Sequence, residues 1–398
     1  MMVNFLFPRL EYSRLGIVLM LYLILAGCQR NAQEMPQNRS DPFASQQKSG
    51  HRKTVAGVSS SNVLSFRHAA RMSTLATVKV KSIFPEVAPL PVPDFYYEFF
   101  NKDYVGPYRM PSGDGRQDNT GSASGVLISE DGYIVTNYHV INTAKSIEVI
   151  LADRHSYPAT VVGTDKATDL ALLKIEAENL PFIEFGNSDS AAVGDIVLIV
   201  GNPLNFTSTV TQGIISYKAR NIAHSSEQWT LQSYLQTDGV VNIGNSGGAL
   251  LDLSGKLLGI VTAIASPNGV YAGYSFAIPV KVVKKTTADL HNYGHVRRGS
   301  FGMTAVEMDA ETAAKLKTSV VAGILIGSIE NGGAADKAGL ARGDIITSIC
   351  GVPVESLAEL SEVVACSYPG QRLLLKVVRN ERHIQNAIIL LGGSGIAK

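Results

Sequence analysis

A serine framed by glycines, in the segment Gly244-Asn245-Ser246-Gly247-Gly248-Ala249-Leu250, constrains this chain more than any other feature. Glycine has no Cβ atom, so the backbone can turn sharply here and another backbone can approach closely. A serine on such a turn can present its Oγ outward. The N–H groups of Gly244, Asn245 and Ser246 can then converge on one point as an oxyanion hole. An ordinary polar turn uses the same residue types, so the segment predicts a nucleophile only together with a base and an orienting acid.

A candidate base closes the segment from Gly132 to Val140. Ile134 and Val135 favour a strand, and the turn signal before them marks its start. His139 follows this strand, and the unperturbed pKa of histidine near neutrality makes it the natural general base. The chain contains eight histidines, so the residue type alone does not select His139.

Two aspartates compete for the orienting role. Asp169 directly precedes an apolar run that predicts a buried strand. A carboxylate at that position could hydrogen-bond a histidine ring nitrogen and fix its tautomer. Asp165 is the rival acid, and either residue could instead cap a turn or a helix. Local chemistry does not separate the two.

The order His, Asp, Ser along the chain is that of the chymotrypsin type. This order, together with the six sequence motifs given at the end of this paragraph, resembles the HtrA (Deg) family of trypsin-like serine proteases. The resemblance extends over roughly residues 65–393. The resemblance selects Asp169 over Asp165, and Asn245 is typical of this family where digestive relatives carry aspartate. The motifs that carry the resemblance are Thr136-Asn137-Tyr138-His139-Val140, Thr168-Asp169-Leu170-Ala171-Leu172, Gln236-Thr237-Asp238, Gly244 to Leu250, Val197 to Pro203 and Gly273 to Pro279.

The resemblance implies a mainly β fold with a chymotrypsin-like pair of six-stranded β-barrels. His139 and Asp169 would come from the first barrel and Ser246 from the second. Short β-rich runs between turn residues agree with a barrel or sandwich, and the run from Val280 to Leu290 predicts a helix that closes the domain. The expected strands include Leu75 to Val80, Ser124 to Ile128, Ile147 to Leu151, Ile196 to Val200, Val210 to Ser216 and Leu257 to Ala263.

The segments Gly323-Ile324-Leu325-Ile326, Ala334 to Leu340 and Gly343-Asp344-Ile345-Ile346 resemble those of a PDZ domain. This resemblance implies an α+β PDZ domain after the barrels, over residues 297–393. Such domains bind an extended peptide as an added strand. By resemblance, the loop Gly299-Ser300-Phe301-Gly302-Met303 would hold the peptide's C-terminal carboxylate. Apolar residues at helical spacing predict a helix within Ser356 to Val364. Cys350 and Cys366 both fall in this domain, and the sequence does not establish a disulfide between them.

The N-terminus predicts export from the cytoplasm. A charged start, a short apolar run and the ending Leu25-Ala26-Gly27-Cys28 are typical of a signal peptide over residues 1–27. The ending resembles a bacterial lipobox, which implies lipidation of Cys28; an uncleaved signal anchor is the alternative. The polar residues 28–64 predict a flexible tether. Both alternatives place the body of the protein in the periplasm, and the net charge of +1 gives no indication of nucleic-acid binding.

Three loops of the expected protease domain, residues 65–292, bear on function. The long loop 85–121 holds an aromatic cluster at 95–100 that either contacts other subunits or packs on its own barrel. Residues 239–243 would shape the oxyanion hole, and residues 265–274 would form the far wall of the substrate pocket. Ile260, Val261 and Ile264 are apolar, which predicts cleavage after a small aliphatic residue.

Together these features predict an envelope serine endopeptidase that degrades misfolded or mislocalised proteins under stress. The resemblance implies substrates that are unfolded or expose a C-terminus, a homotrimer or larger assembly, and no metal or organic cofactor. Two other functions are weighed against this one. The first is a signalling protease that cuts one dedicated membrane substrate. The second is a peptide-binding chaperone with dispensable proteolysis.

Overall fold

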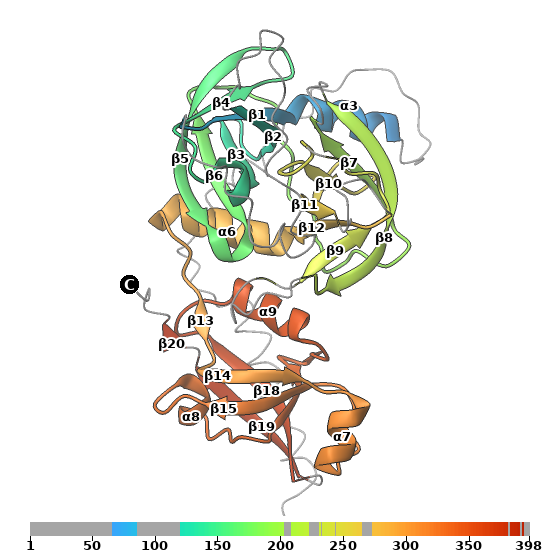
Figure 1. Ribbon diagram of the computed structural model, residues 1–398, viewed down its shortest axis with the longest axis vertical. Coiled ribbons are helices and arrows are strands. Elements are labelled where there is room, and N and C mark those ends of the chain that lie inside the picture. Colours follow the sequence, from blue (N-terminus) through green and yellow to red (C-terminus); the bar gives the residue numbers. More distant parts are fainter. Residues whose placement is uncertain are drawn as a thin grey trace, which may run out of the picture.

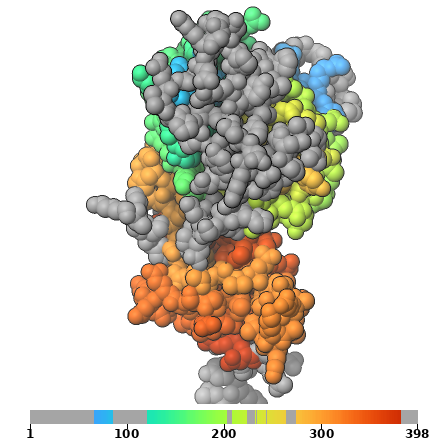
Figure 2. Space-filling model, in the orientation of Figure 1, coloured from blue at the N-terminus to red at the C-terminus, as the bar shows by residue number. Residues whose placement is uncertain are grey.

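The computed structural model describes residues 66–85, 120–202, 208–222, 231, 233–242, 244–264, 273–380, 383–390 and 392–393. These residues form two closed β-barrels followed by a smaller domain of strands and helices (Figure 1). The smaller domain, coloured orange to red, is a separate lobe at one end of the molecule (Figure 2). Within the described ranges, no helix combines the length and the apolar character needed to cross a membrane.

The first barrel closes in the strand order β1-β2-β3-β6-β5-β4. Its sequence alternates as a barrel strand requires: in β1, Val78 and Val80 are buried while Lys79 and Lys81 are partly exposed. A short helix and a 3-10 turn interrupt the strands at the positions of the candidate base and acid. The elements are β1 (Thr77–Ile83), β2 (Thr120–Leu127), β3 (Tyr133–Asn137), α5 (Tyr138–Ile141), β4 (Ser146–Ile150), β5 (Ser156–Asp165), η1 (Lys166–Thr168) and β6 (Leu170–Ile175).

The second barrel closes in the order β10-β11-β12-β9-β8-β7. Strand β7 is buried on both faces. Val197 and Ile199 pack in the core of this barrel, whereas Leu198 and Val200 belong to the larger core that is shared with the first barrel. This explains the unbroken apolar run in its sequence. The strands are β7 (Ile196–Gly201), β8 (Thr209–Arg220), β9 (Tyr234–Thr237), β10 (Ala249–Leu251), β11 (Leu257–Ile264) and β12 (Ser275–Pro279).

Helix α6 (Val280–Tyr293) joins the two barrels from outside. It packs against β5 and β6 of the first barrel and against β11 and β12 of the second. Gly294 ends the helix in a left-handed conformation with φ 71°, and its N–H donates to the Leu290 carbonyl at 2.9 Å. The chain then leaves the barrels for the C-terminal domain.

The C-terminal domain is built on a sheet with the strand order β14-β15-β16-β18-β19, so β14 is an edge strand. Helix α9 begins with a capping box in which Ser356 and Glu359 satisfy each other's backbone N–H groups. The elements are β13 (Gly299–Ser300), β14 (Met303–Glu307), α7 (Ala310–Leu316), β15 (Ile324–Ile329), α8 (Ala334–Lys337), β16 (Ile345–Ile349), β17 (Val352–Pro353), α9 (Leu357–Cys366), β18 (Arg372–Arg379), β19 (His383–Leu390) and β20 (Gly392–Gly393).

The two domains meet where α9 packs against α6. Lys281 Nζ lies 2.5 Å from Glu362 Oε1, and the Ser233 hydroxyl donates to the other oxygen of the same carboxylate. Helix α9 is therefore joined to the protease domain by an ion pair and a charge-assisted hydrogen bond to one carboxylate.

The mainly β, two-barrel fold predicted from the sequence is confirmed, with corrections near the first strand. Residues expected to start a strand at Leu75 instead end a helix, α3 (Phe66–Ala76). This helix buries Ala69, Ser73 and Ala76, which share one face at helical spacing. The last two residues of the expected loop 85–121 belong to β2, where Thr120 pairs with Ile83. The aromatic cluster 95–100, the signal sequence, Cys28 and the tether lie outside the described residues.

Candidate active site

The structure brings His139 and Asp169 into direct contact. His139 lies in α5, immediately after β3, and Asp169 immediately precedes β6, the strand that pairs with β3. Asp169 Oδ2 lies 2.8 Å from His139 Nδ1, and Asp169 Oδ1 accepts the His139 backbone N–H at 2.9 Å. Each carboxylate oxygen thus fixes a different part of the histidine. This geometry is what a general base needs in order to keep one tautomer.

Asp169 is held in an uncommon backbone conformation. Its φ is 54° and its ψ 41°, in the left-handed region at the end of η1. Its carbonyl accepts the Tyr138 N–H at 3.1 Å and the Asn137 side-chain amide at 3.0 Å. These bonds orient the backbone so that the carboxylate points at the base.

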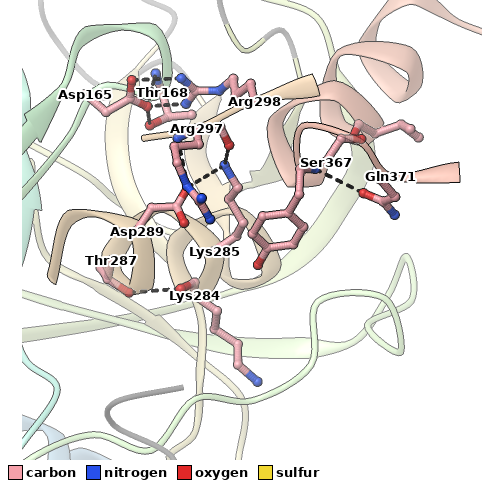
Figure 3. Close-up of polar contacts among 12 residues, drawn as sticks. Asp165, Thr168, Lys284, Lys285, Thr287, Asp289, Arg297, Arg298, Ser367 and Gln371 are labelled. Carbon is pink, nitrogen blue, oxygen red and sulfur yellow. Dashed lines mark hydrogen bonds and ion pairs between the residues drawn. The ribbon is translucent and has the colours of Figure 1, made fainter. Parts of the chain in front are cut away.

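Asp165, the rival candidate for the acid, lies one turn earlier and has a structural role. Its carboxylate accepts the Thr168 N–H at 3.2 Å and so caps η1. It also pairs with the Arg298 guanidinium, whose Nη1 lies 3.0 Å from Oδ1 (Figure 3). Because Arg298 precedes β13, this ion pair joins the interdomain linker to the turn that ends at Asp169.

Thr262 connects Asp169, the candidate acid, to Ser246, the candidate nucleophile. Its hydroxyl donates to Asp169 Oδ2 at 2.7 Å, and its carbonyl accepts the Ser246 hydroxyl at 3.4 Å. Thr262 lies on β11 of the second barrel, so its bond to Asp169 crosses from one barrel to the other, while its bond to Ser246 stays within the second barrel. Thr262 could not be identified from the sequence, because a threonine in an apolar strand carries no local signal of such a role.

The loop around Ser246 depends on its glycines. Gly247 has φ +82°, and a Cβ atom there would lie 2.1 Å from the Ser124 carbonyl oxygen and 2.4 Å from Thr136 Oγ1. Gly244 has φ +99°, a conformation that glycine adopts without strain. Ser246 is partly exposed while its neighbours on both sides are buried.

The backbone donors of this loop are not equivalent. The Asn245 N–H donates to the Asn242 carbonyl at 3.0 Å, and the Gly247 N–H donates to the Val261 carbonyl at 2.8 Å. Among the described residues, the N–H groups of Gly244 and Ser246 take no part in such bonds. Gly244 and Ser246 are therefore better placed than Asn245 to stabilise an oxyanion.

A neutral phenol lies near the acid. Burial and the charge of Asp169 raise the pKa of Tyr234 far above its usual value. The phenol therefore stays neutral beside Asp169 even at pH values at which an exposed tyrosine would ionise.

The expected carboxylate-binding loop of the C-terminal domain has mixed structure. Gly299 and Ser300 form β13, Phe301 is buried, and Met303 begins the edge strand β14. Gly302 lies between them with φ +64°, and its N–H donates to Ser300 Oγ at 3.2 Å. The loop thus adjoins an edge strand to which a peptide strand could be added.

Comparisons with known proteins agree with this geometry. Residues 123–260 match the trypsin-like peptidase domain, and residues 292–378 match the PDZ domain. A solved structure named "HtrA-type protease AlgW with tripeptide" is 32% identical with a TM-score of 0.63, covering 83% of this chain and 98% of that one. Another, named "HtrA-type protease AlgW with decapeptide", is 32% identical with a TM-score of 0.60, covering 83% and 99%.

The chain belongs to the HtrA-type protease family. Named relatives include probable periplasmic serine endoproteases, described as DegP-like, from Chlamydia muridarum (strain MoPn / Nigg) and Pseudomonas putida (strain GB-1). The first is 42% identical over 73% of this chain and 58% of its own length, the second 37% over 76% and 62%. This HtrA-type chain thus spans about three fifths of the length of these curated relatives.

Some predicted site residues of this HtrA-type protease lie beyond the described ranges. Ile243 of the loop 239–243 and residues 265–272 of the pocket wall fall there, as does Cys28. Cys350 and Cys366 are described, and both are free thiols.

Proposed function

We propose that this chain is a periplasmic serine endopeptidase in which Ser246 is the nucleophile, His139 the general base and Asp169 the orienting acid. The observation that carries the proposal is the chain of contacts through Thr262. This residue donates to the carboxylate that holds His139 and accepts from the hydroxyl of Ser246. One residue thus ties the acid, the base and the nucleophile into a single constellation.

The proton position follows from the contact between acid and base. A carboxylate can only accept, so the His139 Nδ1 atom that faces Asp169 carries a proton. Nε2 is then the basic nitrogen, which takes the Ser246 proton as Oγ attacks the peptide carbonyl. The imidazolium that forms is stabilised by Asp169, and it then protonates the leaving amine.

The negative charge on the substrate oxygen needs donors fixed in advance. We assign that role to the Gly244 and Ser246 N–H groups, because the Asn245 N–H is already bonded within the turn. Water completes the cycle by attacking the acyl-enzyme, with His139 again taking the proton. Residues of this chain alone carry these steps.

The C-terminal domain supplies a second, non-catalytic contact with substrate. The loop Gly299 to Met303 would hold a C-terminal carboxylate, with the peptide added along β14. The two AlgW structures, which their titles describe as bound to a tripeptide and a decapeptide, support this role by analogy. Substrates would then be unfolded proteins or proteins with an exposed C-terminus, as quality control under stress requires.

Anchoring and assembly belong to the same proposal. Cleavage of residues 1–27 and lipidation of Cys28 would place the protease on a membrane through the tether 28–64, and a homotrimer or larger assembly would group the active sites. The mass of the mature N-terminus tests the anchor. An unprocessed N-terminus, or one without added acyl mass, would contradict it.

A fluorophosphonate probe tests the catalytic assignment. We expect the wild-type protein to be labelled, and Ser246→Ala to lose the label and the ability to degrade unfolded casein. Ser190→Ala is the matched control, because Ser190 is exposed ahead of β7 and outside the constellation. Equal labelling of wild type and Ser246→Ala would overturn the proposed nucleophile.

A further inference from the structure

A fully buried serine of the first barrel lies against the nucleophile loop. Ser124 is on β2 with no exposed surface. Strand β3 pairs with β2 only at Val126 and Leu127. The backbone of Ser124 is therefore open on that side to groups from the second barrel.

The polar groups of Ser124 all bond near the reaction centre. Its N–H donates to the Ser246 carbonyl at 2.8 Å, and its hydroxyl donates to the Gly244 carbonyl at 2.7 Å. The hydroxyl oxygen accepts the Asn202 N–H at 2.8 Å, and the carbonyl accepts the Thr136 hydroxyl at 2.7 Å. Since a hydroxyl has a single proton to donate, these bonds fix its rotation.

These contacts fix the peptide planes of the loop. Ser124 holds the carbonyls of Gly244 and Ser246, and the Gly248 N–H holds the carbonyl of Asn245 at 2.8 Å. Three successive peptide planes, from Gly244 to Gly247, are thereby set. The middle plane carries the Ser246 N–H; Gly248 holds this plane directly, and the planes on either side of it are held by Ser124.

We propose that Ser124 is a positioning residue for catalysis, which aligns the Ser246 N–H and Oγ by holding the carbonyls on either side. The inference rests on the proposed nucleophilic role of Ser246. It accounts for the close approach at Gly247, where any side chain would collide with the Ser124 carbonyl. It also assigns the first barrel a direct part in setting the oxyanion site of the second.

The neighbouring serine provides a matched control. Ser122 lies on the same strand, and its buried hydroxyl has no hydrogen-bond partner among the described residues. Removing this hydroxyl deletes one oxygen from β2 without touching the loop. Deletion of a buried hydroxyl from β2 as such would affect both variants alike, whereas loss of the bond to the Gly244 carbonyl affects Ser124→Ala only.

The test compares Ser124→Ala, Ser122→Ala and wild type with a chromogenic peptide, normalised to protein that reacts with a fluorophosphonate. We expect Ser124→Ala to lower kcat roughly 10- to 100-fold, less than loss of an oxyanion donor itself. KM should stay within about twofold. A reversible peptide aldehyde, whose hemiacetal oxygen occupies the oxyanion site, should bind more weakly by a similar factor. Ser122→Ala should match wild type in both measurements.

Ser124→Cys provides the test if Ser124→Ala does not fold, because a thiol of similar size donates weakly, and we expect an intermediate kcat. A normal kcat and normal aldehyde affinity in folded Ser124→Ala or Ser124→Cys, even with lowered thermal stability, would overturn the positioning role. Equal losses in Ser122→Ala would also overturn it. Ser246→Ala is measured alongside: if it keeps full activity, the proposed function fails and this inference fails with it.

Discussion

The buried ion pair in α6 allows a quantitative prediction. Lys285 Nζ lies 2.9 Å from Asp289 Oδ2, and the two side chains are only 5% and 4% exposed. Asp289 also accepts the Arg297 N–H at 2.8 Å (Figure 3). We predict that Asp289→Ala lowers the free energy of unfolding by about 3–5 kcal/mol, because it leaves a buried ammonium without its carboxylate.

An exposed pair with the same spacing is the matched control. Lys315 Nζ lies 2.7 Å from Glu311 Oε1 in α7, also four residues apart, with side chains 70% and 76% exposed. Water already solvates both charges, so Glu311→Ala should change the free energy of unfolding by less than about 0.5 kcal/mol. Because both pairs are four residues apart, the difference between the two costs measures the effect of burial.

Asp289→Ala should also make the free energy of unfolding depend on pH. Burial lowers the pKa of Lys285, and the charge of Asp289 opposes this shift. Without Asp289 the folded-state pKa falls further, while the unfolded chain keeps its ordinary value. Between these two pKa values the unfolded state binds more protons, so stability rises with pH. The deficit of Asp289→Ala should therefore shrink as pH rises.

Urea unfolding followed by circular dichroism measures these quantities. Both substitutions are made in a Ser246→Ala background to prevent self-cleavage, and unfolding is compared at about pH 7 and about pH 9.5, below the ordinary lysine pKa of about 10.4. Equal costs for Asp289→Ala and Glu311→Ala, or an unchanged deficit at the higher pH, would refute the reasoning.

Four further predictions follow from the site and the sequence. Thr262→Val should lower kcat/KM roughly 10- to 100-fold, because it removes a hydrogen bond to a charged group. Thr286→Val is the control and should leave the kinetics unchanged, because the buried Thr286 hydroxyl has no hydrogen-bond partner among the described residues. Gly247→Ala should abolish activity, measured as loss of casein cleavage, since its Cβ would lie 2.1 Å from a backbone oxygen. At mildly alkaline pH, iodoacetamide should label exposed Cys350 before Cys366 in a mass-spectrometric time course, because burial raises the pKa of Cys366 to about 11. Profiling of casein fragments should show cuts after small aliphatic residues; cuts mainly after lysine or arginine would contradict the apolar pocket.

Short β-rich runs, such as the one around Val78 and Val80 in β1, indicated a barrel or sandwich, and the family resemblance supplied the pair of six-stranded barrels. The sequence was less informative where packing against other elements decides the secondary structure. Leu75 is compatible with a strand or a helix alike, and packing of α3 against the barrel selects the helix. The choice between Asp165 and Asp169 needed the family resemblance, since local chemistry fits either.

Ser124 and Thr262 could not be found from local sequence at all. Their partners lie 120 and 93 residues away along the chain, and only packing of the two barrels against each other brings them together. A serine in a strand and a threonine in another are ordinary residues. Their roles arise from the register of strands, which the pattern of apolar residues restricts but does not specify.

The hydrogen bond from Thr262 to Asp169 joins residues that are 93 positions apart and belong to barrels synthesised one after the other. His139 and Asp169 belong to the barrel that is synthesised first, whereas Ser246 and Thr262 belong to the second. Neither barrel alone contains all of the proposed catalytic residues. Proteolysis by this chain would therefore begin only once the second barrel has packed onto the first.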